Sequence, residues 1–211
     1  PAGIRLIEGE VLNVDANARY VVVKTSDGQR DMTYDRLVLA AGSRVSLPEI
    51  PGLAMHAMNI DTYDEAERLD RHLRALSRRA PTDGRDTVLV IGAGLTGIEA
   101  ACHMPQRLKA AGIDTGRVIL ADRLPHIGSD MGEYARPVID QALEVLNIET
   151  RTAIEIAALD DGGVTLADGE RIVANTIVWC AGMVASSLAE YLPGARDRLG
   201  RLPVDEFMKF E

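Results

Sequence analysis

The spacing of hydrophobic positions divides the chain into segments typical of strands and segments typical of helices. Short continuous apolar runs indicate strands that are buried on both faces of a sheet, and they cover residues 37–42, 88–91, 117–121 and 176–180. Longer segments indicate helices, and they cover residues 61–80, 95–111 and 133–146. This order of elements predicts an α/β fold with a parallel sheet of the Rossmann-like kind.

Two further regions alternate apolar and polar residues, as strands of antiparallel sheets do. Near the N-terminus these strands cover residues 5–11, 20–24 and 31–34. Later in the chain they cover residues 153–159, 164–167 and 171–174, with glycine turns between them. The second set predicts a small antiparallel β-meander. The end of the chain, residues 206–211, also reads as a strand.

The helix expected at residues 61–80 has clear signals at its start and along one face. Asp61 or Thr62 can cap it, and acidic residues follow near its positive end. Leu69, Leu73 and Leu76 recur at helical spacing, so we expect them to face the core.

The composition of the chain argues against some classes of protein. The chain has 211 residues, of which 46% are hydrophobic and 26% charged, as in soluble globular proteins. Its net charge of −9 argues against a nucleic-acid surface, which needs a basic patch. The uncharged stretch at residues 87–98 is too short to cross a bilayer, and no signal peptide is visible.

Cysteine and histidine positions give no sign of a redox pair or a metal site. Cys102 and Cys180 lie 78 positions apart, which favours two buried, reduced thiols in a cytoplasmic protein. The four histidines show no ligand spacing, and scattered polar positions explain them better. We therefore predict no metal.

The most informative stretch is the glycine-rich sequence Gly92-Ala93-Gly94-Leu95-Thr96-Gly97. The first glycine permits a tight turn out of the strand, the second lets the backbone approach a pyrophosphate, and the third lets the helix pack near the strand. The backbone amides of Leu95 and Thr96 would open a helix, where an anion is favoured. A strand–turn–helix without any ligand is the alternative, because glycine-rich turns are common.

Two acidic residues bear on the identity of the dinucleotide. Asp122 closes the strand after the loop, where a carboxylate accepts hydrogen bonds from ribose hydroxyls and repels a 2′-phosphate. It therefore favours NAD over NADP, and the adjacent Arg123 weakens that exclusion a little. Glu99 follows the loop in an apolar stretch. It either points toward the nicotinamide or stands near the helix N-terminus for its dipole.

Three motifs in order resemble the pyridine nucleotide–disulfide oxidoreductase superfamily, the flavoproteins with two dinucleotide-binding domains. The first is the run from Tyr34 to Ser43, similar to that family's strand ending in Ala-Thr-Gly beside FAD. The second is the glycine loop with Glu99. The third runs from Ala174 to Gly182 and resembles the second Ala-x-Gly strand, which returns to FAD. Within the superfamily, residues 178–186 look most like type II NADH dehydrogenases.

This resemblance implies an enzyme with FAD and NAD as cofactors. Hydride would pass from NADH to the flavin and then to an acceptor such as a quinone. Glu99 would lie near the flavin–nicotinamide contact, Ala181 and Gly182 would border the flavin ring, and Gly42 would lie near the FAD pyrophosphate or adenosine. The cofactors carry such chemistry, so no acid–base residue is nominated as catalytic.

The resemblance also implies a division of the chain. Residues 1–80 would be part of an FAD-binding domain, 81–182 the NAD(H)-binding domain and 183–211 a segment returning to the FAD domain. The FAD glycine loop of the family would lie upstream of residue 1, so the chain reads as a fragment that lacks full activity alone. The whole protein would be cytoplasmic or peripheral on the inner face of the membrane.

Two other functions stay open at this point. One is a disulfide- or ferredoxin-type NAD(P)H reductase of the same superfamily. The other is a fragment that binds NAD without turnover. Neither the acceptor nor the oligomeric state follows from the sequence.

Overall fold

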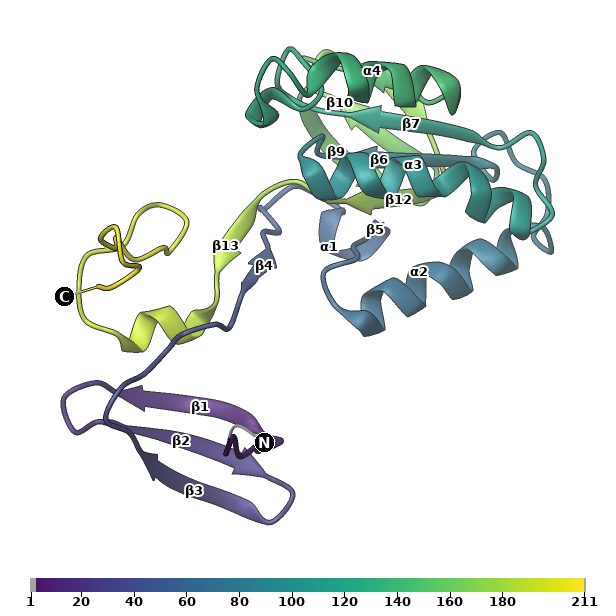
Figure 1. The fold of residues 1–211 in the computed structure, drawn as a ribbon. Coiled ribbons are helices and arrows are strands. Elements are labelled where there is room, and N and C mark those ends of the chain that lie inside the picture. The colour runs from purple at the N-terminus through teal and green to yellow at the C-terminus, as the bar shows by residue number, and fades with distance from the viewer. Residues whose placement is uncertain (1–2, 211) are drawn as a thin grey trace. The chain divides into compact units, whose positions relative to one another are not determined.

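A computed structural model describes residues 3–210 of the chain (Figure 1). These residues form two compact units. The first contains residues 3–44 and 183–210, and the second runs from Val45 to Gly182. The chain therefore enters the second unit once and leaves it once.

The second unit is built on a five-stranded sheet with the order β5-β12-β6-β7-β8. All four neighbouring pairs are parallel. The strands are β5 (Ala57–Met58), β6 (Thr87–Ile91), β7 (Arg117–Ala121), β8 (Glu149–Arg151) and β12 (Thr176–Trp179). Every residue of β6 and of β12 is buried, as continuous apolar runs in a covered parallel sheet should be.

Helices cover one face of this sheet. They are α2 (Tyr63–Leu76), α3 (Leu95–Ala110) and α4 (Arg136–Val145). Because side chains alternate across a strand, Val88 and Val90 of β6 pack in one core cluster with residues of these three helices. Leu89 and Ile91 belong to a second cluster on the other face.

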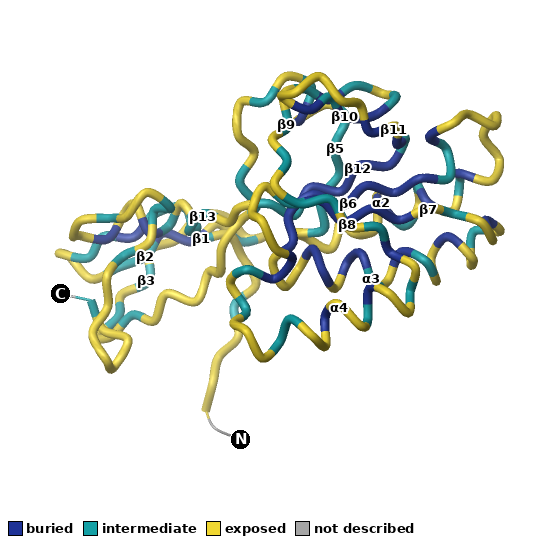
Figure 2. Tube along the Cα trace, turned by 90° about the horizontal axis from the view of Figure 1, so that it is seen from above, coloured by how far each residue is buried: buried dark blue, intermediate teal, exposed yellow. Residues whose placement is uncertain are grey.

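The opposite face is covered by the β-meander and the short helix α1 (Leu53–His56). The meander consists of β9 (Ile156–Asp160), β10 (Gly163–Leu166) and β11 (Arg171–Val173), paired antiparallel in the order β11-β10-β9. The unit thus has three layers, and Figure 2 shows the buried residues concentrated along the sheet.

Local sequence signals mark the start of α2 and the end of α3, although α2 ends at Leu76 and not at residue 80 as expected. The Thr62 hydroxyl accepts a hydrogen bond from the Glu65 amide at 3.3 Å and caps α2. Leu69, Leu73 and Leu76 are buried, as predicted. At the end of α3, Gly112 has a φ of 81° and the Ile113 amide bonds to the Leu108 carbonyl, which is a glycine-terminated helix end.

The first unit contains a three-stranded antiparallel sheet of β1 (Glu10–Asp15), β2 (Tyr20–Thr25) and β3 (Gly28–Thr33). Two short strands, β4 (Ser43–Val45) and β13 (Met183–Ala185), pair at the positions where the chain passes between the units. A 3₁₀ helix, η2 (Ser187–Tyr191), follows β13. It is capped by the Ser186 hydroxyl, which accepts from the Leu188 amide at 3.3 Å.

Several expected elements are wrong or displaced. The apolar run at residues 37–42 is not a strand, and Val38 is 86% exposed, because no described strand pairs with it. The first strand begins at Glu10 instead of Arg5. The described residues 206–210 form no strand: residues 206–208 turn, and Asp205 accepts from the amides of Phe207 and Lys209. Helix α4 starts at Arg136, three positions later than expected.

The compact units also divide the chain differently from the expected domains. Residues 45–80 pack with the second unit, because the leucines of α2 share a core with Val88 and Val178. The assignment of an FAD-binding part and an NAD-binding part stays a prediction.

Candidate dinucleotide site

The candidate site lies where strands β6, β7 and β12 end. Parallel strands bring their carboxyl ends to one edge of the sheet, so the residues that follow them meet there. Gly92 follows β6, Asp122 follows β7 and Cys180 follows β12. The amide of Gly92 donates to the Ala121 carbonyl at 2.8 Å, and that of Cys180 donates to the Ile91 carbonyl at 2.8 Å. The three strand ends are thus linked by backbone hydrogen bonds.

Two of the three loop glycines are required by the fold itself. Gly92 has a φ of 101°, which disfavours side chains, and a Cβ there would stand 2.6 Å from the Ala181 nitrogen. A Cβ on Gly97 would stand 1.7 Å from the Gly92 carbonyl oxygen. The first glycine therefore makes the turn, and the third lets α3 pack against the loop.

Gly94 differs from both, because nothing in the protein around it requires a glycine. Its φ is −75°, an ordinary value, and a Cβ there would meet no protein atom within 4 Å. It is the N-cap residue of α3, and no side chain caps that helix end among the described residues. The first amides of α3 therefore have no intrahelical acceptor and favour an anion. Because no side chain covers the backbone at Gly94, a diphosphate can approach it closely.

Asp122 holds the glycine loop with both carboxylate oxygens. One oxygen, Oδ2, accepts from the Ala93 amide at 2.5 Å, and the other, Oδ1, accepts from the Leu124 amide at 2.7 Å. Hydrogen bonds to a charged group are stronger than neutral ones. The carboxylate therefore fixes the loop conformation, and each oxygen keeps a further lone pair for a hydroxyl donor.

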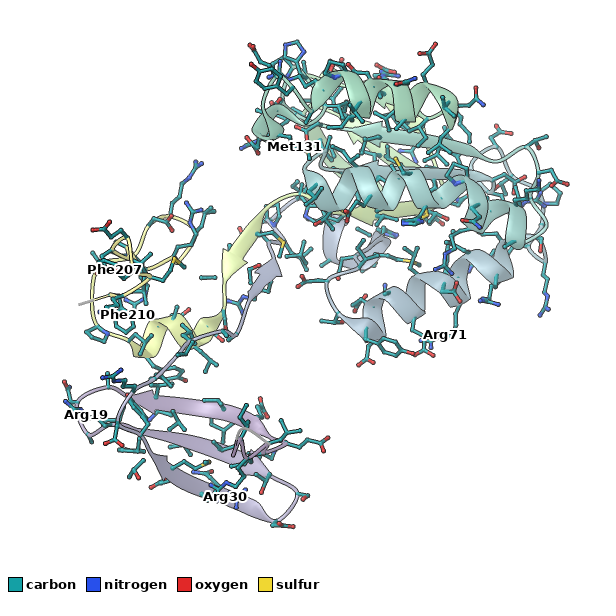
Figure 3. All side chains as sticks on the ribbon, in the orientation of Figure 1. Arg19, Arg30, Arg71, Met131, Phe207 and Phe210 are labelled. Atoms are coloured by element: carbon teal, nitrogen blue, oxygen red, sulfur yellow. The ribbon has the colours of Figure 1, made fainter. Side chains whose placement is uncertain are left out.

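The segment after Asp122 folds back onto the glycine loop. The Gly128 amide donates to the Ala93 carbonyl at 3.0 Å, and Ile127 is buried. Next comes the short 3₁₀ helix η1 (Ser129–Met131), whose Met131 packs against the core cluster under the helices (Figure 3). Arg123 is exposed at the start of this segment.

The other predicted site residues are placed differently. Glu99 is exposed, while its apolar neighbours Ile98 and Ala100 are buried. It also lies beyond the first turn of α3, which weakens the helix-dipole interpretation. Leu95 and Thr96 are exposed at the helix start.

Ala181 belongs to the second unit and lies against Gly92, and Gly182 ends that unit with a φ of 76°. Gly42 has a φ of 65° and belongs to the first unit. The site described here therefore does not include it.

Both free cysteines are half-buried, and not fully buried as expected. Burial raises the pKa of the Cys180 thiol to about 12 and also raises that of Cys102. The His72 ring nitrogen Nε2 lies 2.8 Å from the buried Thr176 hydroxyl. Burial, with Arg79 and Arg68 nearby, lowers the His72 pKa to about 4. Within residues 3–210 no cluster of three or more metal-ligating side chains exists.

Sequence reasoning missed the contacts that anchor the two ends of the second unit. The Trp179 indole donates to the Ser46 carbonyl at 2.8 Å, and the Asp61 carboxylate accepts from the Val45 amide at 2.9 Å. The first pair is separated by 133 residues, and no local pattern could have connected them. The presence of a single tryptophan in the chain was the only available signal.

Comparison with known proteins identifies the family. The family model of the pyridine nucleotide-disulphide oxidoreductases matches residues 1–211, so the chain belongs to that family. An NADH dehydrogenase-like protein of Mycobacterium tuberculosis is 52% identical and covers 99% of this chain. A type II NADH:quinone oxidoreductase of the same organism is 31% identical over 96% of the chain. The chain spans about half the length of these relatives, 52% and 48% respectively.

Solved structures support the fold. An NAD-dependent persulfide reductase from A. fulgidus superposes with a TM-score of 0.73 at 22% identity, covering 97% of this chain and 36% of its own. NDH2 from Plasmodium falciparum, solved with NADH, gives a TM-score of 0.70 at 15% identity, covering 88% and 42%. Among residues 3–210, no helix combines the length and hydrophobicity needed to cross a membrane.

Proposed function

We propose that this chain supplies the NADH-binding part of an FAD-dependent NADH dehydrogenase. The observation that carries the proposal is that no protein atom lies near the place where a Gly94 side chain would be, so the backbone there is open to a ligand. The turn at Gly92 and the Asp122 carboxylate hold the loop in this conformation. Family membership and the printed names of the relatives support the reaction class.

Each part of the site has a separate role in this proposal. The amides of Leu95 and Thr96, at the start of α3, hold the diphosphate. Asp122 accepts hydrogen bonds from the adenosine ribose and keeps the loop in shape through the Ala93 amide. Because a 2′-phosphate would meet this carboxylate, NADH is favoured, while the exposed Arg123 reduces the discrimination.

We further propose that FAD is the second cofactor of the whole protein. FAD would supply the redox chemistry, taking the hydride of NADH and passing electrons to an acceptor such as a quinone. In this chain Ala181 and Gly182 border it, with Glu99 near the nicotinamide. In the first unit, Gly42 is the residue proposed to contact FAD. With a quinone as acceptor, the whole protein would associate peripherally with a membrane.

The test is the absorbance spectrum of the whole protein under anaerobic conditions. Addition of NADH should bleach the flavin bands, and a subsequent quinone should restore them. NADPH at the same concentration should act more slowly. A flavin that NADH leaves oxidised would contradict the proposed function, and a reduced flavin that only a disulfide or an iron–sulfur protein reoxidises would move it to another reductase class.

A further inference from the structure

The two points at which the chain enters and leaves the second unit are joined by hydrogen bonds inside that unit. Val45 is its first residue and Gly182 its last. The Ser46 amide donates to the Gly182 carbonyl at 3.0 Å, and the Ser46 carbonyl accepts from the Trp179 indole at 2.8 Å. The Ser46 backbone is therefore held by the last residue of β12 and by the last residue of the unit.

Asp61 holds Val45, the residue before Ser46. Its Oδ2 accepts from the Val45 amide at 2.9 Å, and its own amide donates to the Asn59 side chain at 3.0 Å. Asp61 immediately precedes the capping residue Thr62, so its backbone is fixed to the start of α2. The entry point is thus held by a strand end and by a helix start.

The same cluster lies against the glycine loop. Trp179 is 6% exposed and pairs with Ile91, the residue before Gly92. Ala181, two residues after Trp179, is close enough to Gly92 that a single added Cβ would clash with its backbone. A buried indole N–H needs an acceptor, and here that acceptor is the entering chain.

We propose that Trp179 and Asp61 are positioning residues. Asp61 fixes Val45 to the start of α2 and Trp179 fixes Ser46 to the end of β12. Because Ser46 also bonds to Gly182, the two side chains keep Ala181 and Gly182 in a set place beside the glycine loop. The inference rests on the proposed function, in which the loop holds NADH and Ala181–Gly182 border the flavin. Neither side chain is catalytic in this account.

The position of these residues determines which kinetic step depends on them. Neither Trp179 nor Asp61 bonds to residues 92–97, so the diphosphate site is left intact when they change. Reduction of the flavin needs the reacting atoms to be held in near-attack geometry, which small displacements disrupt. The rate of flavin reduction should therefore fall, while the Kd for NADH should stay the same.

The experiment uses the whole protein and four variants. Trp179→Phe keeps an aromatic ring and removes the N–H donor, and Asp61→Ala removes the acceptor. Asp61→Asn keeps an acceptor oxygen and is the conservative rescue. Thr82→Val is the matched control. It removes a hydrogen bond of 2.7 Å from the Thr82 hydroxyl to the side chain of Asn175, the residue before β12 begins, at the opposite end of that strand. Rapid-mixing kinetics give the reduction rate and the NADH Kd, and hydrogen exchange reports on the amides of Val45 and Ser46.

Asp61→Ala removes the acceptor of the Val45 amide and should raise exchange there by about threefold to tenfold, the worth of one hydrogen bond. Trp179→Phe removes the donor to the Ser46 carbonyl and, by loosening that segment, should raise exchange at the Ser46 amide by a similar factor. Both variants should slow flavin reduction by at least a similar factor at unchanged Kd. Asp61→Asn and Thr82→Val should resemble the wild type in both measurements.

Unchanged exchange in both Trp179→Phe and Asp61→Ala would overturn the inference. It would also be overturned by faster exchange with an unaltered reduction rate, or by a rate loss of equal size in Thr82→Val. A wild type whose flavin NADH does not reduce would overturn the proposed function instead, and the exchange rates alone would then decide whether these side chains hold the two segments.

Discussion

Replacing the second and third loop glycines with alanine should separate nucleotide binding from folding. In Gly94→Ala the new Cβ meets no protein atom within 4 Å and the φ of −75° suits alanine. The loss of an N-cap glycine costs up to about 1 kcal/mol. The lower entropy of the unfolded chain returns about 0.4–1 kcal/mol. The free energy of unfolding should therefore change by less than about 1 kcal/mol, a Tm shift within about 4 °C.

Gly97→Ala should behave in the opposite way. The Cβ would stand 1.7 Å from the Gly92 carbonyl oxygen, so the loop and α3 must separate. Overpacking of this kind costs about 3 kcal/mol, the upper end of the usual range, because the contact is with backbone and not with a flexible side chain. The corresponding fall in Tm is about 6–12 °C.

The assay combines thermal unfolding with a titration followed by NADH fluorescence. Gly94→Ala should keep its Tm and lose NADH affinity by at least about tenfold, because the methyl group occupies the space that the diphosphate needs. The main effect of Gly97→Ala should be on stability, seen as a lower Tm. A Gly94→Ala protein that binds NADH as tightly as the wild type would refute the role given to the loop.

Two further predictions concern stability alone. The His72 pKa of about 4 lies below the unfolded value near 6.5, so the unfolded chain binds the proton first as the pH falls. The contribution of His72 to stability should be complete above pH ~6.5 and should be lost between about pH 6.5 and 4. The loss should be about 1–2 kcal/mol after allowance for solvent screening. In urea unfolding, His72→Gln should flatten this part of the curve of stability against pH. Thr62→Ala removes the cap of α2 and should cost about 1 kcal/mol in the same assay, without any change in NADH affinity; an undiminished stability would contradict the capping role.

The elements around the site could be predicted because their signals are local. Continuous apolar runs located β6 and β7 within a residue, and the glycine spacing located the start of α3. The end of that helix lies within a residue of the expected position, and Gly112 follows it with a left-handed backbone. Each of these features depends on residues that are neighbours in the sequence, so pattern and turn chemistry suffice.

Other features depend on distant partners and were out of reach. The run at residues 37–42 has the composition of a buried strand, but a strand forms only where another strand pairs with it. Asp122 was predicted from its position after β7, yet its bond to the Ala93 amide across 29 residues appears only in three dimensions. The exposure of Glu99 depends on how α3 packs, which its apolar neighbours alone do not determine.

The most direct test of the central claim is the ratio of NADH to NADPH affinity in the wild type and in Asp122→Ala. The wild type should bind NADH at least about tenfold more tightly than NADPH, because the carboxylate accepts from a ribose hydroxyl and repels a 2′-phosphate. In Asp122→Ala this preference should disappear, and NADH should bind more weakly because the Ala93 amide also loses its acceptor. Equal affinities in the wild type, or a preference that survives in Asp122→Ala, would contradict the account.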